Sequence, residues 1–140
     1  MELKVKRIHD SAKLPSYGHK GDAGLDLFSS INCVLAKGEI KAIATGIQVE
    51  IPVGYVGLVW DKSGISLNGI HRLAGVIDSG YRGEVKVVMA NLGDKDFSVE
   101  TGMKIAQLLI QPILEVTVIN ADKLEVTSRG ENGFGSTGKY

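Results

Sequence analysis

The chain has 140 residues, of which 44% are hydrophobic and 23% charged, and this suits one folded domain with a single core. Its 16 lysine and arginine residues balance its 16 aspartate and glutamate residues, so no overall basic surface exists to bind nucleic acid. One cysteine, Cys33, and three scattered histidines exclude an internal disulfide and argue against a zinc site.

The dominant period along the chain is two, which predicts β-strands with one buried face. In chain order, strands are predicted at 3–6, 47–51, 55–60, 85–89, 108–110 and 116–118. The runs at 55–60 and 108–110 are continuously apolar, so we expect them to be buried on both faces. No run is apolar and long enough to span a bilayer, and the N-terminus carries no apolar signal segment. We therefore expect a cytoplasmic protein that does not contact membranes.

Glycine is frequent, at 18 residues, and glycine-containing turn signals separate the predicted strands. This short spacing predicts an all-β sandwich or barrel. Only residues 121–125 are expected to form a helical turn, which disfavours a doubly wound α/β fold. The stretch 129–140 is glycine-rich and nearly free of apolar residues, so we expect an arm that is mobile in the isolated chain. The predicted organisation is a β-rich domain at 1–128 that carries this arm at 129–140.

Asp78 lies in the segment Gly75–Gly83, which is predicted to form a β-hairpin with the carboxylate at its mouth. An aspartate in such a place can cap its own turn by accepting hydrogen bonds from backbone N–H groups, and this segment alone favours that interpretation. The alternative is that Asp78 accepts a proton from a water molecule that a second group positions.

Polar residues at the ends of other predicted strands allow similar alternatives. Lys62, Ser63 and Gly64 offer a charge, a hydroxyl and a backbone N–H to phosphate oxygens, but a solvated lysine before a common Ser-Gly turn explains them as well. Gln107 interrupts the apolar run 105–110, and its amide needs partners. A core hydrogen bond to the backbone and a role in holding water or a phosphate oxygen are equal alternatives for this side chain.

The arm holds one aromatic residue among glycines, and its composition is typical of a nucleotide clamp. Glycine backbone N–H groups can wrap a polyphosphate, and Arg129 can bridge two phosphate oxygens. Phe134 can stack on a base, which is worth about 1–3 kcal/mol in single-strand binders. An arm that orders on binding nucleotide fits this composition better than a passive tail.

Together these segments resemble the five motifs of the trimeric dUTPase family, in the family's order, over nearly the whole chain. The matching segments are Ala23–Leu27, Lys62–Ile65, Gly75–Glu84, Gly102–Leu108 and Arg129–Gly138. The third and fifth match most closely. The resemblance implies an all-β fold of the β-clip or jelly-roll kind that forms a homotrimer. Each active site would take its first, second and fourth motifs from one subunit, its third from a neighbour, and its fifth from the arm of the third.

The resemblance also implies the reaction, which is hydrolysis of dUTP to dUMP and pyrophosphate by attack of water on the α-phosphorus. This reaction limits uracil incorporation into DNA and supplies dUMP for dTMP synthesis. Asp78 would be the catalytic base, and Gln107 would hold the water or an α-phosphate oxygen. Mg²⁺ would be the cofactor, carried mainly by the triphosphate, with Asp26 contacting it through water.

The remaining implied roles concern the substrate. The backbone of Gly75, Val76 and Ile77 would read the uracil edge, and Tyr81 would pack against deoxyribose and leave no room for a 2′-hydroxyl. The other positions that would contact substrate are Lys62, Ser63, Gly64, Arg72, Lys86, Lys104, Arg129, Phe134, Gly135, Ser136 and Thr137. Those of the second motif would grip phosphates, and those of the arm would hold the γ-phosphate, with Phe134 over the uracil.

Three places depart from the family pattern. The second motif usually begins Pro-Arg, and here Asp61 and Lys62 stand in those positions. Lys104 also stands where arginine is common, and lysine keeps the charge but loses the two-pronged guanidinium. Arg72 stands where the family commonly has asparagine, near the uracil and the catalytic water.

Two alternative functions follow from these observations. A dCTP deaminase-like enzyme shares this fold, but that family places a catalytic glutamate where this chain has Val88, which cannot move protons. A nucleotide-binding trimer without catalysis is compatible with the altered Lys62 and Arg72. The intact Asp78 and Gln107 argue against it.

Overall fold

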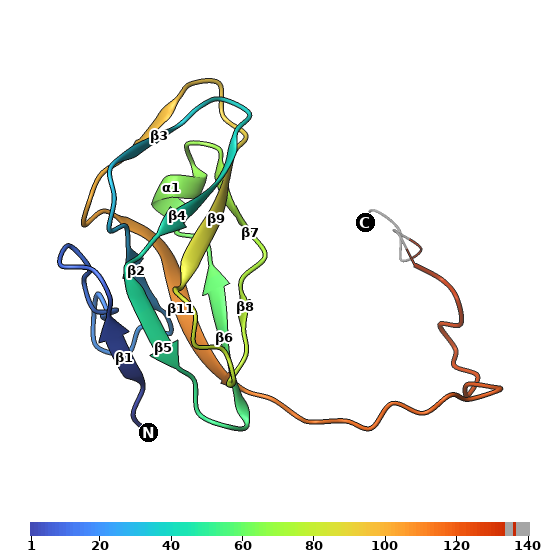
Figure 1. The fold of residues 1–140 in the computed structure, drawn as a ribbon. Helices are drawn as coiled ribbons and strands as arrows, with labels where there is room; N and C mark the ends of the chain where they lie inside the picture. Colours follow the sequence, from blue (N-terminus) through green and yellow to red (C-terminus); the bar gives the residue numbers. More distant parts are fainter. Residues whose placement is uncertain (134–135, 137–140) are drawn as a thin grey trace.

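The computed structural model describes residues 1–133 and residue 136, and β-strands make up nearly all of its regular structure (Figure 1). Its elements in chain order are β1 (Lys4–Arg7), β2 (Leu25–Phe28), β3 (Cys33–Leu35), β4 (Ile40–Ala44), β5 (Ile47–Glu50), β6 (Tyr55–Trp60), α1 (Ser63–Ser66), β7 (Ile70–Leu73), β8 (Val76–Ile77), β9 (Lys86–Asn91), β10 (Phe97–Val99) and β11 (Lys104–Pro112). The predicted all-β class is confirmed. Within the described part of the chain, no helix is long and apolar enough to cross a membrane.

The strands form two larger sheets and two strand pairs. The four-stranded sheet has the order β2-β11-β6-β8, and the three-stranded sheet has the order β4-β9-β7. The smaller pairs are β1 with β5 and β3 with β10, and all these pairings are antiparallel. Alternate residues of both larger sheets meet in one core, so the period of two seen in the sequence is the period of burial.

The core holds the sheets together by apolar burial. Leu27 of β2 and Leu108 of β11 are fully buried, as are Ile43 of β4 and Val87 of β9 from the other sheet. Each such side chain contributes about 1.5–3 kcal/mol relative to an exposed position. The strands predicted at 3–6, 47–51, 55–60, 85–89 and 108–110 are confirmed, with small shifts at their ends.

Burial on both faces of β6 and β11 was a wrong prediction. In β6, Gly57 and Val59 are buried, whereas the alternate residues are half-buried and Trp60 is 50% exposed. In β11, Leu108 is buried but Leu109 and Ile110 are only half-buried. The physical reason is that the four-stranded sheet presents only one side to the core of a single chain.

The strand predicted at 116–118 and the helical turn predicted at 121–125 are also wrong. β11 ends at Pro112, and the chain then leaves the β-body as an exposed segment without helix or strand up to residue 133 (Figure 1). Val116 and Val118 are 73% and 90% exposed. An alternating pattern forms a strand only where another strand satisfies its backbone N–H and C=O groups. The domain boundary at residue 128 stays a prediction.

Candidate functional site

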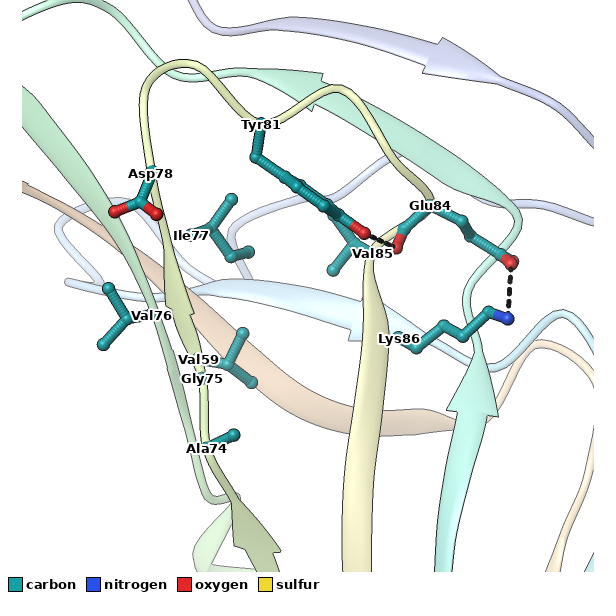
Figure 2. A pocket seen from close by; sticks show the side chains of 10 residues that line it. All are labelled: Val59, Ala74, Gly75, Val76, Ile77, Asp78, Tyr81, Glu84, Val85 and Lys86. Carbon is teal, nitrogen blue, oxygen red and sulfur yellow. Dashed lines mark hydrogen bonds and ion pairs between the residues drawn. The ribbon is translucent and has the colours of Figure 1, made fainter.

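A pocket of about 360 Å³ opens between β8 and the start of β9 (Figure 2). Its lining residues are Val59, Ala74, Gly75, Val76, Ile77, Asp78, Tyr81, Glu84, Val85 and Lys86. In Figure 2, Ile77 points toward Tyr81 and Val85, whereas Val76 and Asp78 point to the opposite side of the segment. The structure therefore brings together the predicted nucleoside-binding residues of the third motif.

The pocket exists because the two arms of the predicted hairpin diverge. β8 pairs with β6, through Gly57–Ile77 and Leu58–Val76, whereas β9 pairs with β4 and β7. Only a turn remains at the tip, where the N–H of Tyr81 donates to the carbonyl of Asp78 over 3.1 Å. The hairpin prediction is thus wrong in its pairing: the arms enter different sheets, and the space between them is the pocket.

Tyr81 lies across this pocket in a fixed orientation. Its hydroxyl donates to the carbonyl oxygen of Glu84 over 3.1 Å. A Cβ atom on Gly83 would collide with the tyrosine ring, so glycine is required for the ring to lie this close to the backbone. The carboxylate of Glu84 accepts a hydrogen bond from the N–H of Gly46 at 2.9 Å, and its other oxygen lies 3.5 Å from Nζ of Lys86. These contacts fix the segment from Tyr81 to Lys86, which lines one side of the pocket.

Asp78 is exposed, and among the described residues its carboxylate takes part in no hydrogen bond or ion pair. The interpretation of Asp78 as the cap of its own turn is therefore wrong, because a cap would accept a backbone N–H. An exposed carboxylate without an internal partner at the rim of a pocket is free to accept a proton from water.

A second group of predicted residues meets around Asp26. The side chain of Asp26 is 6% exposed, and its two oxygens lie 2.6 Å from Nζ of Lys62 and 2.7 Å from Nζ of Lys104. Burial alone would raise the pKa of Asp26, but the hydrogen bonds and charges of Lys104 and Lys62 outweigh it and hold this pKa below its ordinary value. Lys62 is therefore not a merely solvated lysine, and the group carries a net charge of about +1.

This pairing predicts a pH-dependent contribution to stability. Because the folded-state pKa of Asp26 is lowered, its contribution is complete above the ordinary pKa of 3.8 and is lost as pH falls through the lower folded value. Asp26→Asn should lower the free energy of unfolding by about 1–3 kcal/mol at neutral pH. Urea unfolding at fixed protein concentration should show the difference shrinking below about pH 4. An unchanged difference at pH 2 would contradict this prediction, and Asp94→Asn serves as the exposed control.

Gln107 is held between this group and β6. In the sheet it opposes Asp26 on one side and Trp60 on the other, and its Nε2 donates to the carbonyl of Asp61 over 2.8 Å. A Cβ atom on Gly24 would lie 2.8 Å from Oε1 of Gln107, so a side chain at this position of the first motif would displace the glutamine amide. The backbone hydrogen bond is therefore present. Among the described residues, Oε1 has no hydrogen-bond partner, which leaves it able to accept from water.

Asp61 is a site residue whose connections the sequence did not reveal. Its carboxylate accepts the N–H of Arg72 at 2.7 Å and lies 2.7 Å from Nδ1 of His71, while its carbonyl holds Gln107. It connects the end of β6 to β7 and β11. The sequence showed only that a charged residue follows the apolar run at 55–60 and stands where the second motif usually has proline.

The other predicted residues are spread over the molecule. Ser63 and Gly64 are exposed in α1, and Arg72 folds back on its own loop, where its Nη1 donates to the carbonyl of Ala74. Arg129 and Ser136 belong to the arm, whose described residues 129–133 lie away from the β-body (Figure 1). Nε of Arg129 donates to the carbonyl of Asn132 over 3.0 Å. The predicted Phe134, Gly135 and Thr137 lie outside the described residues.

A single chain keeps Asp78 and Gln107 apart. Ile77 opposes Gly57 on β6, whereas Gln107 opposes Trp60 at the other end of that strand. Gly57 and Trp60 are three residues apart on an extended strand, so Ile77 and Gln107 are separated by roughly 10 Å along β6. Asp78 follows Ile77 on the side that points away from Gln107, which makes its separation larger still. A water molecule cannot contact both side chains within one chain.

The donor set also limits how a metal ion could bind. Among the described residues, no three His, Cys, Asp or Glu side chains gather closely enough to hold one. Both oxygens of Asp26 already accept from lysines. These residues therefore fit a cation whose ligands are mainly polyphosphate oxygens and water, which is how Mg²⁺ usually binds. They do not fit a cation held only by protein side chains.

Comparison with known proteins gives a consistent result. The family model described as dUTPase matches residues 10–138. Deoxyuridine 5′-triphosphate nucleotidohydrolase from Clostridium kluyveri is 52% identical over 141 residues, covering 99% of both chains. The dUTPase of Staphylococcus bacteriophage 80alpha with dUPNHPP superposes with a TM-score of 0.92 at 32% identity, covering 98% of both chains. A variant dUTPase of S. aureus phage phi11, described with a structural Mg(II) ion, gives 0.83 at 29% identity over 90% of this chain and 100% of its own.

Proposed function

The chain belongs to the dUTPase family, and we propose that it hydrolyses dUTP to dUMP and pyrophosphate with Asp78 as the general base. The observation that supports this proposal is the pocket of the third motif, whose lining includes Tyr81 and Asp78 and which lies at the free edge of β8. The carboxylate of Asp78 is exposed and has no partner among the described residues.

The pocket supports binding of the uracil nucleoside. β8 is the edge strand of its sheet, and the N–H of Val59 already donates to the carbonyl of Gly75, two residues before Ile77. In an antiparallel pair the bonded positions alternate, so Ile77 turns its backbone groups toward Gly57 of β6, and the N–H and C=O of Val76 face away from β6 and are available to a ligand. These groups would form hydrogen bonds with the donors and acceptors of the uracil edge, as they would with a neighbouring strand. The narrow space along this edge would exclude the thymine methyl group, and the ring of Tyr81 would pack against deoxyribose.

The positive group around Asp26 supports binding of the phosphates. Lys62 and Lys104 would donate their remaining N–H groups to phosphate oxygens, beside Ser63 and Gly64 of α1. Bound with the triphosphate, Mg²⁺ would neutralise charge on the phosphates and the pyrophosphate leaving group. Asp26 would reach the ion only through a bound water, since both its oxygens accept from lysines.

We propose that the active site is shared within a homotrimer. The support is the separation of Asp78 from Gln107 within one chain, together with an exposed apolar segment that follows β11. Leu114, Val118, Leu124 and Val126 are each more than four-fifths exposed, which an isolated chain in water would not favour. A neighbouring chain would cover this segment and bring its own Asp78 to the Gln107 of the first.

In the assembled site the reaction needs two protein groups close to the water. Oε1 of Gln107 would accept one hydrogen bond from the water and so orient its oxygen toward the α-phosphorus. The carboxylate of Asp78 would take the proton as the new P–O bond forms and the bond to the pyrophosphate oxygen breaks. Arg129 would hold the γ-phosphate as the arm closes and excludes solvent.

Substrate selection tests this function directly. We expect kcat/KM for dUTP to exceed that for dTTP, dCTP and UTP by about 100-fold or more, because each competitor adds a clash or leaves a polar group unpaired. The measurement is pyrophosphate release in magnesium buffer. Ammonia release from dCTP would favour a deaminase, and tight dUTP binding without pyrophosphate release would favour a non-catalytic binding trimer.

A further inference from the structure

The turn between β7 and β8 has a conformation that its sequence disfavours. Ala74 has φ of 58°, the only positive φ of a non-glycine residue in the described part of the chain, and Gly75 follows with φ of 113°. The left-handed region is open to glycine but crowded for alanine, because Cβ approaches the following carbonyl. This turn sets the direction in which the chain continues from β7 into β8 and Asp78. Other interactions must therefore stabilise its disfavoured conformation.

Arg72 makes the contact that holds this turn. Its Nη1 donates to the carbonyl of Ala74 over 2.6 Å, a charge-assisted bond back onto the disfavoured residue. Its guanidinium lies over the ring of Trp60, 4.9 Å from the centroid, and its backbone N–H is fixed by Asp61. The side chain is therefore clamped between β6 and the turn.

The same arrangement keeps Arg72 out of the pocket. Arg72 is absent from the residues that line it, and its Nε is buried without a hydrogen-bond partner among the described residues. A substrate-binding arginine would present this N–H to the ligand. On the far side of the turn, the carbonyl of Gly75 accepts the N–H of Val59 at 2.8 Å, which continues the connection into β6.

We propose that Arg72 is a positioning residue that holds the Ala74–Gly75 turn in its left-handed conformation and thereby fixes the edge that reads uracil. This inference rests on the proposed function, because it assigns that edge to the nucleobase. It gives Arg72 a role through the backbone rather than through direct contact with the nucleotide.

The test measures dUMP binding by calorimetry for the wild type, Arg72→Ala, Ala74→Gly and the double variant. Arg72→Ala should bind dUMP about tenfold more weakly, the expected loss when one charge-assisted hydrogen bond no longer orders the site. Glycine at position 74 adopts the positive φ without steric cost. The double variant should therefore bind dUMP within about threefold of Ala74→Gly alone, so that Arg72→Ala costs much less affinity with glycine at position 74 than with alanine.

Several results would overturn the inference. If Arg72→Ala binds as the wild type does, the clamp is not needed, and if glycine fails to restore binding, Arg72 acts in some other way, such as direct contact. Arg72→Lys, which keeps the charge, guards against a misfolded alanine variant: it should lose less affinity and be restored by the same glycine. If the wild type hydrolyses dUTP but the variants do not show these changes in dUMP affinity, only the proposed role of Arg72 is refuted. A wild type that neither binds dUMP nor hydrolyses dUTP refutes both proposals.

Discussion

Replacing Asp78 with asparagine is expected to lower the rate of dUTP hydrolysis by about 10²- to 10⁴-fold. Asparagine has the size of aspartate but cannot take the proton of the attacking water. Because the carboxylate of Asp78 makes no hydrogen bond or ion pair among the described residues, the fold should not depend on it. Pyrophosphate release at saturating dUTP and magnesium gives kcat, and the unfolding midpoint should stay close to that of the wild type.

The matched control is Asp94→Asn, which removes another exposed carboxylate, from the loop between β9 and β10. It should hydrolyse dUTP at the wild-type rate. Binding of the unhydrolysed substrate separates the two ways in which Asp78→Asn could fail. A variant that binds dUTP normally and turns it over slowly has lost the base, whereas equal turnover by variant and wild type would remove Asp78 from this role.

The sequence predicted the strands because burial in this fold follows a period of two. Val85, Val87 and Met89 alternate with polar or half-buried residues, and the structure buries those three in the core. The same period misled at Val116 and Val118, because periodicity describes faces and says nothing about whether a partner strand is present. It also gave no information on pairing, so β8 was expected beside β9 when it lies beside β6.

The sequence predicted the part of the site that lies in one continuous segment. It did not predict the contacts between residues that are far apart in the chain. Gly75 to Tyr81 is one continuous segment, and its residues do line one pocket. Lys62 is 36 positions from Asp26, and only the ladders of β2, β11 and β6 bring the two together. The role that we propose for Arg72 depends on the positive φ of Ala74, and a backbone angle leaves no mark in a pattern of side chains.

Removing residues 129–140 is expected to leave a folded β-body and to lower kcat/KM for dUTP by about 10²-fold or more. The hydrogen bonds of Arg129 to Gly133 in the described chain stay within the arm or reach only Thr127, so the sheets do not depend on them. We expect this loss of activity because, in the proposed function, Arg129 holds the γ-phosphate and closure of the arm excludes water. A chain ending at Gly138, which keeps the fifth motif, should retain wild-type activity. Full activity without residues 129–140 would contradict the clamp.

Mixing two inactive chains tests whether sites are shared between subunits. Asp78→Asn has an intact arm but no base, and the truncated chain has a base but no arm. If each site takes Asp78 from one neighbour and the arm from the other, every mixed trimer contains one complete site. Equal, random mixing by co-expression should then restore about a quarter of the wild-type activity per chain.

The control mixes two variants of the same segment, Asp78→Asn and Tyr81→Ala. Both residues line one pocket of one chain, so no arrangement of these chains rebuilds a complete site. The activity of this control mixture should equal the mean activity of its two variants. The activity of the first mixture should far exceed the mean of its own two variants. If both mixtures show only the average of their components, each site takes its base and its arm from the same chain. That outcome would refute the proposal that Asp78 and the arm reach each site from different subunits.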